Sequence, residues 1–201
     1  SHPTIYILDR DGALIDTFAQ PGDNERGMKD LTFDGELIWG TIQNIVYGMT
    51  PEGEIVSTFE SPYNPTNNIA WDSNRECLWI SSTASDPVAY TGDGDPFENL
   101  QIDRNGFHIY GMTYWEQDPD GYPLYLFHKN RENDRPTLHK VNIETGDMVF
   151  VTELISEIEA SIIGSCITND YDIFNWTFIN IANTQGNAGG DRIDCWQLKG
   201  F

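Results

Sequence analysis

The chain has 201 residues, a mass of 22.8 kDa and a formal net charge of −21, with 32 Asp and Glu against 11 Lys and Arg. A surface this acidic repels phosphate backbones and anionic lipid headgroups, which argues against nucleic-acid-binding and membrane-surface proteins. No run of 18 apolar residues occurs, so we expect no membrane insertion. The carboxylate excess suits a cationic ligand, a divalent metal or simple solubility.

An internal repeat organises the first part of the chain. The segment Ile5–Pro21 is echoed by Val46–Pro62, and Gly12 corresponds to Gly53, 41 residues later. A period of about 40 residues, built from short alternating strands, is typical of a β-propeller. We therefore predict an all-β chain that folds as one β-propeller domain over residues 1–201. It would have about four to five four-stranded blades, in a ring that is incomplete or part of a larger one.

In chain order, the repeats fall near residues 5–29, 30–67, 68–108, 109–161 and 162–201. Turn residues divide these repeats into two, four, four, four and three strands. The expected strands are Thr4–Asp9 and Ala13–Phe18; Asp30–Asp34, Glu36–Ile42, Ile45–Thr50 and Glu54–Glu60; Asn68–Asp72, Cys77–Ser81, Val88–Thr91 and Asn99–Asp103; Ile109–Trp115, Pro123–His128, Thr137–Ile143 and Asp147–Leu154; Ile162–Thr168, Ile173–Ile181 and Arg192–Leu198. In several hairpin turns a glycine stands just before the next strand, where a positive φ closes a bulged turn.

The total of 17 strands does not divide into whole four-stranded blades. Open strand edges in both terminal repeats favour pairing with another chain. Three explanations stay open: the chain is an excerpt of a longer propeller, a small ring is closed by mixing its terminal strands, or neighbouring chains complete one another head to tail. The predicted partner is accordingly a protein or a second copy of this chain, bound through the terminal strands.

Aromatic residues recur at two positions of the repeat. Phe33, Trp71 and Tyr114 occupy one equivalent position, and Trp39 and Trp79 occupy the other. Large rings at repeating positions fill the gaps that wedge-shaped sheets leave between them. We therefore expect these rings to pack blade against blade.

A three-part pattern also recurs: an apolar strand that ends in Asp, a Leu-Trp strand, and a strand closed by Asp-x-x-Gly. Here it is Ile69-Ala-Trp-Asp72, Leu78-Trp79 and Ile7-Leu8-Asp9 to Gly12. In this pattern the chain resembles the NHL-repeat and gluconolactonase-like group of propellers, well over residues 5–103 and loosely over 109–198. The resemblance implies a divalent ion in the central channel, whose bound water would be the nucleophile of a lactonase-type hydrolase.

Two sets of residues are candidate ligands for Ca²⁺. The first places carboxylates close together in one loop, a donor type that suits calcium, and consists of Asp93, Asp95 and Glu98. The second follows from the resemblance to the gluconolactonase-like group and consists of Asp34, Asp72 and Asn169. Asp and Asn are also ordinary turn residues, because they bond their own backbone. The alternative is therefore that no cofactor is bound and that these residues hold turns.

No catalytic signature is present in the sequence. It contains no GxSxG elbow, P-loop or GxGxxG fingerprint, and its histidines lack HxH or HExxH spacing. The three cysteines lack CxxC spacing, and a Cys166–Cys195 disulfide stays open.

We predict a non-enzymatic, extracellular or cell-envelope module that binds or assembles with a protein partner through loops at one face of the propeller. One alternative is a divalent-metal-dependent hydrolase of lactonase type. The other is a carbohydrate-binding propeller, in which Trp115 or Trp176 would contact the glycan.

Overall fold

The computed structural model describes residues 3–22, 25, 27–130, 132, 134–155, 161–183 and 191–198. Every regular element in these ranges is a β-strand, and they contain no helix that is long and apolar enough to span a membrane. The strands are β1 (Thr4–Leu8), β2 (Leu14–Ala19), β3 (Leu31–Phe33), β4 (Ile38–Ile42), β5 (Ile45–Met49), β6 (Ile55–Glu60), β7 (Asn68–Asp72), β8 (Cys77–Ser81), β9 (Val88–Tyr90), β10 (Pro96–Asn99), β11 (Ile109–Tyr114), β12 (Leu124–Lys129), β13 (Pro136–Val141), β14 (Met148–Glu153), β15 (Ser161–Thr168), β16 (Thr177–Asn183) and β17 (Arg192–Gln197).

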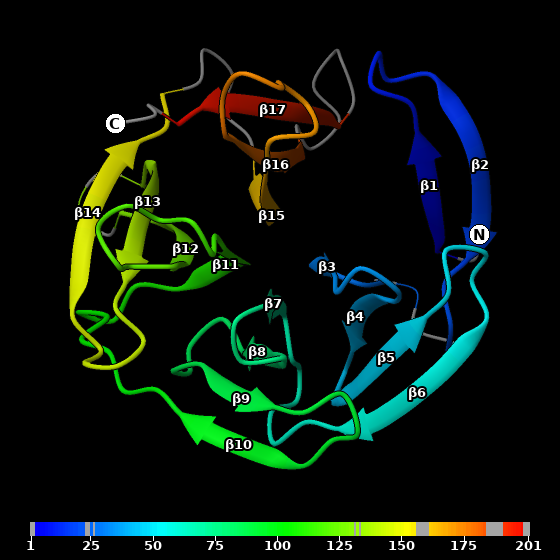
Figure 1. The fold of residues 1–201 in the computed structure, drawn as a ribbon, viewed down its shortest axis with the longest axis horizontal. Coiled ribbons are helices and arrows are strands. Elements are labelled where there is room, and N and C mark those ends of the chain that lie inside the picture. The colour runs from blue at the N-terminus through cyan, green and yellow to red at the C-terminus, as the bar shows by residue number, and fades with distance from the viewer. Residues whose placement is uncertain are drawn as a thin grey trace.

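Four antiparallel sheets surround a central axis, which confirms the β-propeller (Figure 1). Strands β3–β6, β7–β10 and β11–β14 form three four-stranded sheets, and β15–β17 form a three-stranded one. The first strand of each sheet lies nearest the axis, and the last lies outermost (Figure 1). Hairpin β1–β2 forms a separate two-stranded sheet at the rim of the ring. The chain is therefore a four-bladed propeller with an additional rim hairpin.

The core lies between neighbouring sheets. Trp39 and Val46 of the first four-stranded sheet share a buried cluster with Leu78 of the second. Trp79 is completely buried in the next cluster, together with Met112 of the third sheet. Blade-to-blade packing through the repeated tryptophans is thus observed at both interfaces.

An aspartate after the inner strand holds an aromatic side chain of the second strand in each four-stranded sheet. Asp34 accepts the indole N–H of Trp39 at 2.7 Å, Asp72 accepts that of Trp79 at 3.1 Å, and Asp118 accepts the hydroxyl of Tyr125 at 2.6 Å. The same carboxylates accept backbone N–H groups of their own turns. Each aspartate therefore closes a turn and fixes a core aromatic at once.

The expected fourth strand of the third repeat, Asn99–Asp103, is wrong, because β10 covers Pro96–Asn99. The cause is the turn before it. Thr91 Oγ1 accepts the N–H of Asp95 at 3.1 Å, just as Thr50 accepts that of Glu54 at 3.3 Å. The turn is complete at Asp95, so the strand starts at the next residue.

The expected strand Ile173–Ile181 is also misplaced, since β16 begins at Thr177. Asp172 accepts the N–H of Phe174 at 2.9 Å through its side chain and that of Asn175 at 3.1 Å through its carbonyl. These bonds close a turn, and Phe174 is 86% exposed on it. An apolar residue is here part of a turn.

One contact between blades repeats along the rim. Gly53 lies in the β5–β6 turn, and a Cβ built there would collide with Phe18 of β2. Gly94 lies in the equivalent β9–β10 turn, and its Cβ would collide with Phe59 of β6. Hairpin β1–β2 thus packs on the next blade just as β5–β6 packs on its own neighbour. Nothing lies within 4 Å of a Cβ built on Gly12 of the β1–β2 turn.

Substitutions of Gly12 and Gly94 distinguish the cost of backbone strain from the cost of a steric clash. Gly12 and Gly94 have φ of 83° and 89°, so an alanine at either position costs about 1 kcal/mol in strain. We expect Gly94→Ala to cost about 1–3 kcal/mol more, because its methyl group must displace Phe59. Urea denaturation of both variants measures the difference. Equal losses of stability would show that the ring-on-glycine contact does not hold the blades together.

Candidate binding site

One carboxyl group, that of Asp30, lies between the inner strands of the four sheets. Asp30 directly precedes the inner strand β3 and is 3% exposed. Its Oδ1 accepts the N–H of Ser165 at 3.0 Å, and its Oδ2 accepts those of Ile69 at 3.2 Å and Met112 at 3.0 Å. These donors lie on β15, β7 and β11, the inner strands of the other three sheets. A single side chain therefore ties all four blades together at the axis.

Burial dominates the protonation of this carboxyl group. Desolvation raises the pKa of Asp30 from 3.8 to about 8, although four backbone N–H groups, including that of Leu31, favour the charged form. Because the folded pKa lies above the unfolded one, the folded state binds a proton that the unfolded state releases. The stability contributed by this proton is complete below about pH 4 and is lost as the pH rises through about 8.

Sequence reasoning did not identify Asp30, although a signal exists. It lies three residues before the inner-strand aromatic Phe33, and Asn68 lies three residues before the equivalent Trp71. Asn68 is also completely buried and donates to Ser81 Oγ at 3.0 Å. A polar residue three positions before the inner-strand aromatic thus recurs in two blades, whereas the third blade has Gly111 at this position.

The role of Asp30 is tested by Asp30→Asn. The amide has one acceptor oxygen, so N–H donors on the axis lose their partner, at a cost of about 2–4 kcal/mol. We expect this loss to be largest near pH 5 and to shrink toward pH 9, because only the wild type gives up the stability contributed by the Asp30 proton as the pH rises from about 4 to about 8. Urea denaturation across this pH range measures both values, with Asp11→Asn, on an exposed turn, as the control. A loss that does not change with pH would contradict this account.

A cavity of about 540 Å³ is lined mainly by residues of the four inner strands and of the turns that follow them. Asp30 itself is not part of the lining, but its neighbour Leu31 and its hydrogen-bond partner Ser165 are. The size of the cavity is that of small-molecule sites in proteins. Aromatic side chains form much of its wall, namely Phe33, Trp71, Tyr114, Trp115 and Trp176. The Trp115 and Trp176 rings lie 5.3 Å apart at 44°, and Phe33 is 53% exposed.

The charged lining of this cavity is entirely acidic. Asp34, Glu116 and Asp170 belong to it, and the described lining contains no Lys, Arg or His. Glu116 accepts the hydroxyl of Ser73 at 2.6 Å, and Asp170 accepts that of Thr168 at 3.3 Å. Since these partners are neutral, no Lys or Arg of the described residues is paired with Glu116 or Asp170.

Two buried polar groups of the lining have no partner in the described part of the chain: the indole nitrogen of Trp115 and the hydroxyl of Ser165. The two residues are 6% and 8% exposed. Buried polar groups are normally paired, so unpaired ones beside a cavity indicate unused capacity for a ligand or water.

The first predicted calcium set lies at the rim, away from this cavity. Asp93 and Asp95 belong to the β9–β10 turn, where Gly94 N–H donates to the Thr91 carbonyl at 3.0 Å. Glu98 is paired with Arg75 at 2.7 Å. The structure therefore gives these residues roles in a turn and in an ion pair.

The residues of the second predicted calcium set have different structural roles. Asp34 and Asp72 hold the tryptophans Trp39 and Trp79, and Asp72 is completely buried. Asn169 is exposed beside Asp170. Within the described residues, no group of three or more His, Cys, Asp and Glu is arranged to hold a metal ion. The geometry gives calcium no support, and it stays a prediction.

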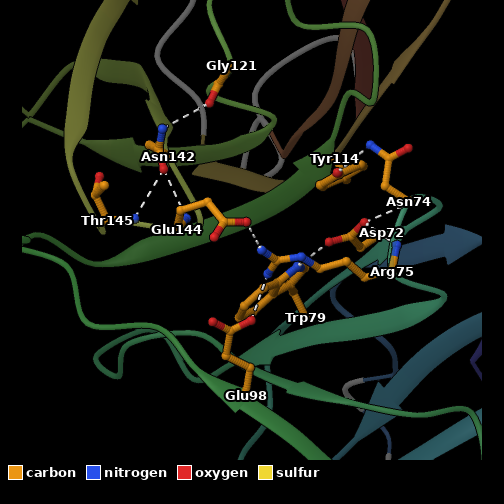
Figure 2. Close-up of polar contacts among 10 residues, drawn as sticks. All are labelled: Asp72, Asn74, Arg75, Trp79, Glu98, Tyr114, Gly121, Asn142, Glu144 and Thr145. Atoms are coloured by element: carbon orange, nitrogen blue, oxygen red, sulfur yellow. Dashed lines mark hydrogen bonds and ion pairs between the residues drawn. The ribbon is translucent and has the colours of Figure 1, made fainter.

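Arg75 joins two blades near the periphery (Figure 2). It donates to Glu98 of its own sheet and to Glu144 of the β13–β14 turn. Asn142 holds that turn by accepting the N–H groups of Glu144 and Thr145 at 2.9 and 3.1 Å. Arg75 therefore neutralises two carboxylates at a blade interface, and its guanidinium group links the two neighbouring blades.

The remaining reactive side chains lie apart from the cavity, with one exception. All three cysteines are free, so the Cys166–Cys195 disulfide is not formed; Cys166 lines the cavity. His128 and His139 share a 2.7 Å hydrogen bond between ring nitrogens. Burial lowers the pKa of His128 to about 4, so it is neutral in the folded protein.

No protein-family model matches the chain, and no curated protein matches its sequence. Solved structures do share its fold. A protein of unknown function from Bacteroides caccae is 6% identical, with 95% of this chain and 68% of that chain covered and a TM-score of 0.50. A chain of the nidogen/laminin complex is 12% identical; the match covers 94% of this chain and 73% of that chain, with a TM-score of 0.56.

The WD40 domain of Pan2 from Neurospora crassa is 10% identical, and the match covers 94% of this chain and 54% of that one, with a TM-score of 0.54. Identities this low show the propeller fold alone. The narrower resemblance to the NHL-repeat and gluconolactonase-like group stays a prediction.

Proposed function

We propose that this propeller is a binding module that receives its ligand in the cavity between the inner strands. The observation that carries the proposal is the cavity itself: about 540 Å³, with aromatic walls contributed by several blades. Pockets that are mostly apolar with a few polar groups are the usual form of ligand sites. The blades act as a rigid frame, and residues from all four sheets converge on the ligand.

The predicted setting belongs to this proposal. An acidic, extracellular or cell-envelope propeller would meet a protein partner at the face where the inner strands end, and a segment of that partner would enter the cavity. Three of the six tryptophans line the cavity, so binding has an intrinsic fluorescence signal.

Blocking the cavity tests this proposal. Cys166 lines it, whereas Cys195 is an exposed cysteine two strands away in the same sheet, in register through Ile179. We expect Cys166→Trp to abolish ligand binding, because the indole fills the entrance, and Cys195→Trp to leave it unchanged. Tryptophan fluorescence and calorimetry against a panel of small molecules and peptides measure binding. Ligands that bind both variants equally would place the site elsewhere and overturn the proposal.

Self-association is a second candidate function, favoured by one observation. Tyr6, Leu8 and Leu14 share one face of hairpin β1–β2, since Leu8 is paired with Leu14, and they are 65%, 39% and 60% exposed. On β16–β17, Ile181 and Ile193 are paired and 48% and 53% exposed. Exposed apolar patches of this kind mark association surfaces.

Light scattering tests self-association. If copies meet through the hairpin, the mass should rise above 22.8 kDa with concentration, and more so at high salt, where repulsion between acidic chains is screened. Leu14→Lys should return the protein to a monomer. Val56→Lys, a matched change at a residue of β6 that is 61% exposed, should not. A constant monomer mass in the wild type would refute the idea.

A further inference from the structure

We infer that the cavity recognises a cationic group with an apolar periphery, namely an alkylammonium or a guanidinium. This inference rests on the proposed function and specifies its ligand. The group would come either from a small organic cation or from a Lys or Arg side chain of the protein partner. Both sources present the same chemistry to the cavity.

The walls are suited to such a group. Five aromatic side chains line one cavity, and the faces of aromatic rings attract cations through their quadrupole, tryptophan most strongly. Three of the five are tryptophans, and the pair Trp115–Trp176 is held at 5.3 Å and 44°. The same rings remove the methylene or methyl groups of an organic cation from water, which a hydrated metal ion does not require.

The charge of the lining points the same way. Asp34, Glu116 and Asp170 carry carboxylates, and no ion pair joins them to a Lys or Arg within the described chain. A concave surface of one sign concentrates its field and attracts the opposite charge. An anionic ligand would meet this field and the net charge of −21 together, so it is disfavoured.

The unpaired groups add an independent observation. The Trp115 indole N–H and the Ser165 hydroxyl are buried and lack a partner in the part of the chain described. The Ser165 hydroxyl can accept a hydrogen bond from an ammonium or a guanidinium, whereas the Trp115 indole N–H can only donate one, to a carbonyl or hydroxyl oxygen of the ligand.

The experiment compares cations with neutral molecules of the same shape. Choline is paired with 3,3-dimethyl-1-butanol, and acetyl-Gly-Arg-Gly amide is paired with its citrulline counterpart. Binding to wild-type protein is followed by tryptophan fluorescence and calorimetry. We expect each cation to bind at least about tenfold more tightly than its neutral partner. Tighter binding of the peptide than of choline assigns the cation to a protein partner, and the reverse order assigns it to a small molecule.

Matched variants connect the preference to the cavity. Glu116→Gln with Asp170→Asn removes two cavity charges and should weaken cation binding about tenfold while leaving the neutral molecules unchanged. Glu52→Gln with Asp11→Asn removes two exposed charges on rim turns and should change neither. Unchanged unfolding midpoints show that both double variants are folded.

Two failures are distinguishable. Neutral molecules that bind as tightly as the cations, or neutral sugars that bind while the cations do not, overturn this inference, but the proposed function stands if Cys166→Trp abolishes their binding. Ligands that still bind the blocked Cys166→Trp variant overturn both.

Discussion

The fold depends on a buried carboxyl group, that of Asp30, which would be costly to bury without its hydrogen-bond partners. Asp30 collects N–H groups from the inner strands of three sheets and is itself attached to the fourth. Backbone donors at a propeller axis have no strand on their inner side, so they need another acceptor. Because one side chain supplies it to three strands, those strands must approach the axis together. The inner strands are consequently held together at the axis, and the residues beside this contact, such as Leu31 and Ser165, line the cavity.

Around this centre, the acidic residues divide into two groups with different work. Asp34, Asp72 and Asp118 close turns and hold core aromatics. Others, such as Glu116 and Asp170, face the cavity with neutral partners only. The net charge of −21 includes both groups of acidic residues, although only the residues that line the cavity are available to a ligand there. Asp34 belongs to both, because it binds Trp39 and also lines the cavity.

A propeller supplies no function by itself, since unrelated activities occur on this frame. The similar solved structures, at 6–12% identity, extend to the frame and no further. What distinguishes this chain is local: a cavity whose walls are aromatic, whose charges are all negative and whose buried donors are partly unused. The side chains that the repeats bring together in this cavity therefore support the proposed binding module.

The sequence by itself determined the all-β class, the two, four, four, four and three strands of successive units, and the turn glycines. These features are local, because alternation and turn chemistry act within a few residues. It also predicted that the repeated aromatics pack blade against blade, which is confirmed for Trp39 and Trp79. Phe33, Trp71 and Tyr114 line the cavity, and Phe33 is largely exposed. Strand limits failed at β10, because the preceding turn is already complete at Asp95, and at β16, because a turn at Asp172 includes apolar residues.

Only the tertiary structure decided what the axis contains and where a ligand fits. Asp30 and Ser165 are 135 residues apart in sequence but share a hydrogen bond, and no local pattern encodes that meeting. In the sequence, most of the predicted calcium ligands were similar, because they were acidic residues near turns. In the structure, Glu98 forms an ion pair with Arg75, and Asp72 is buried in the core. The cavity is lined by residues of all four inner strands, so it is a property of the ring and of no single repeat.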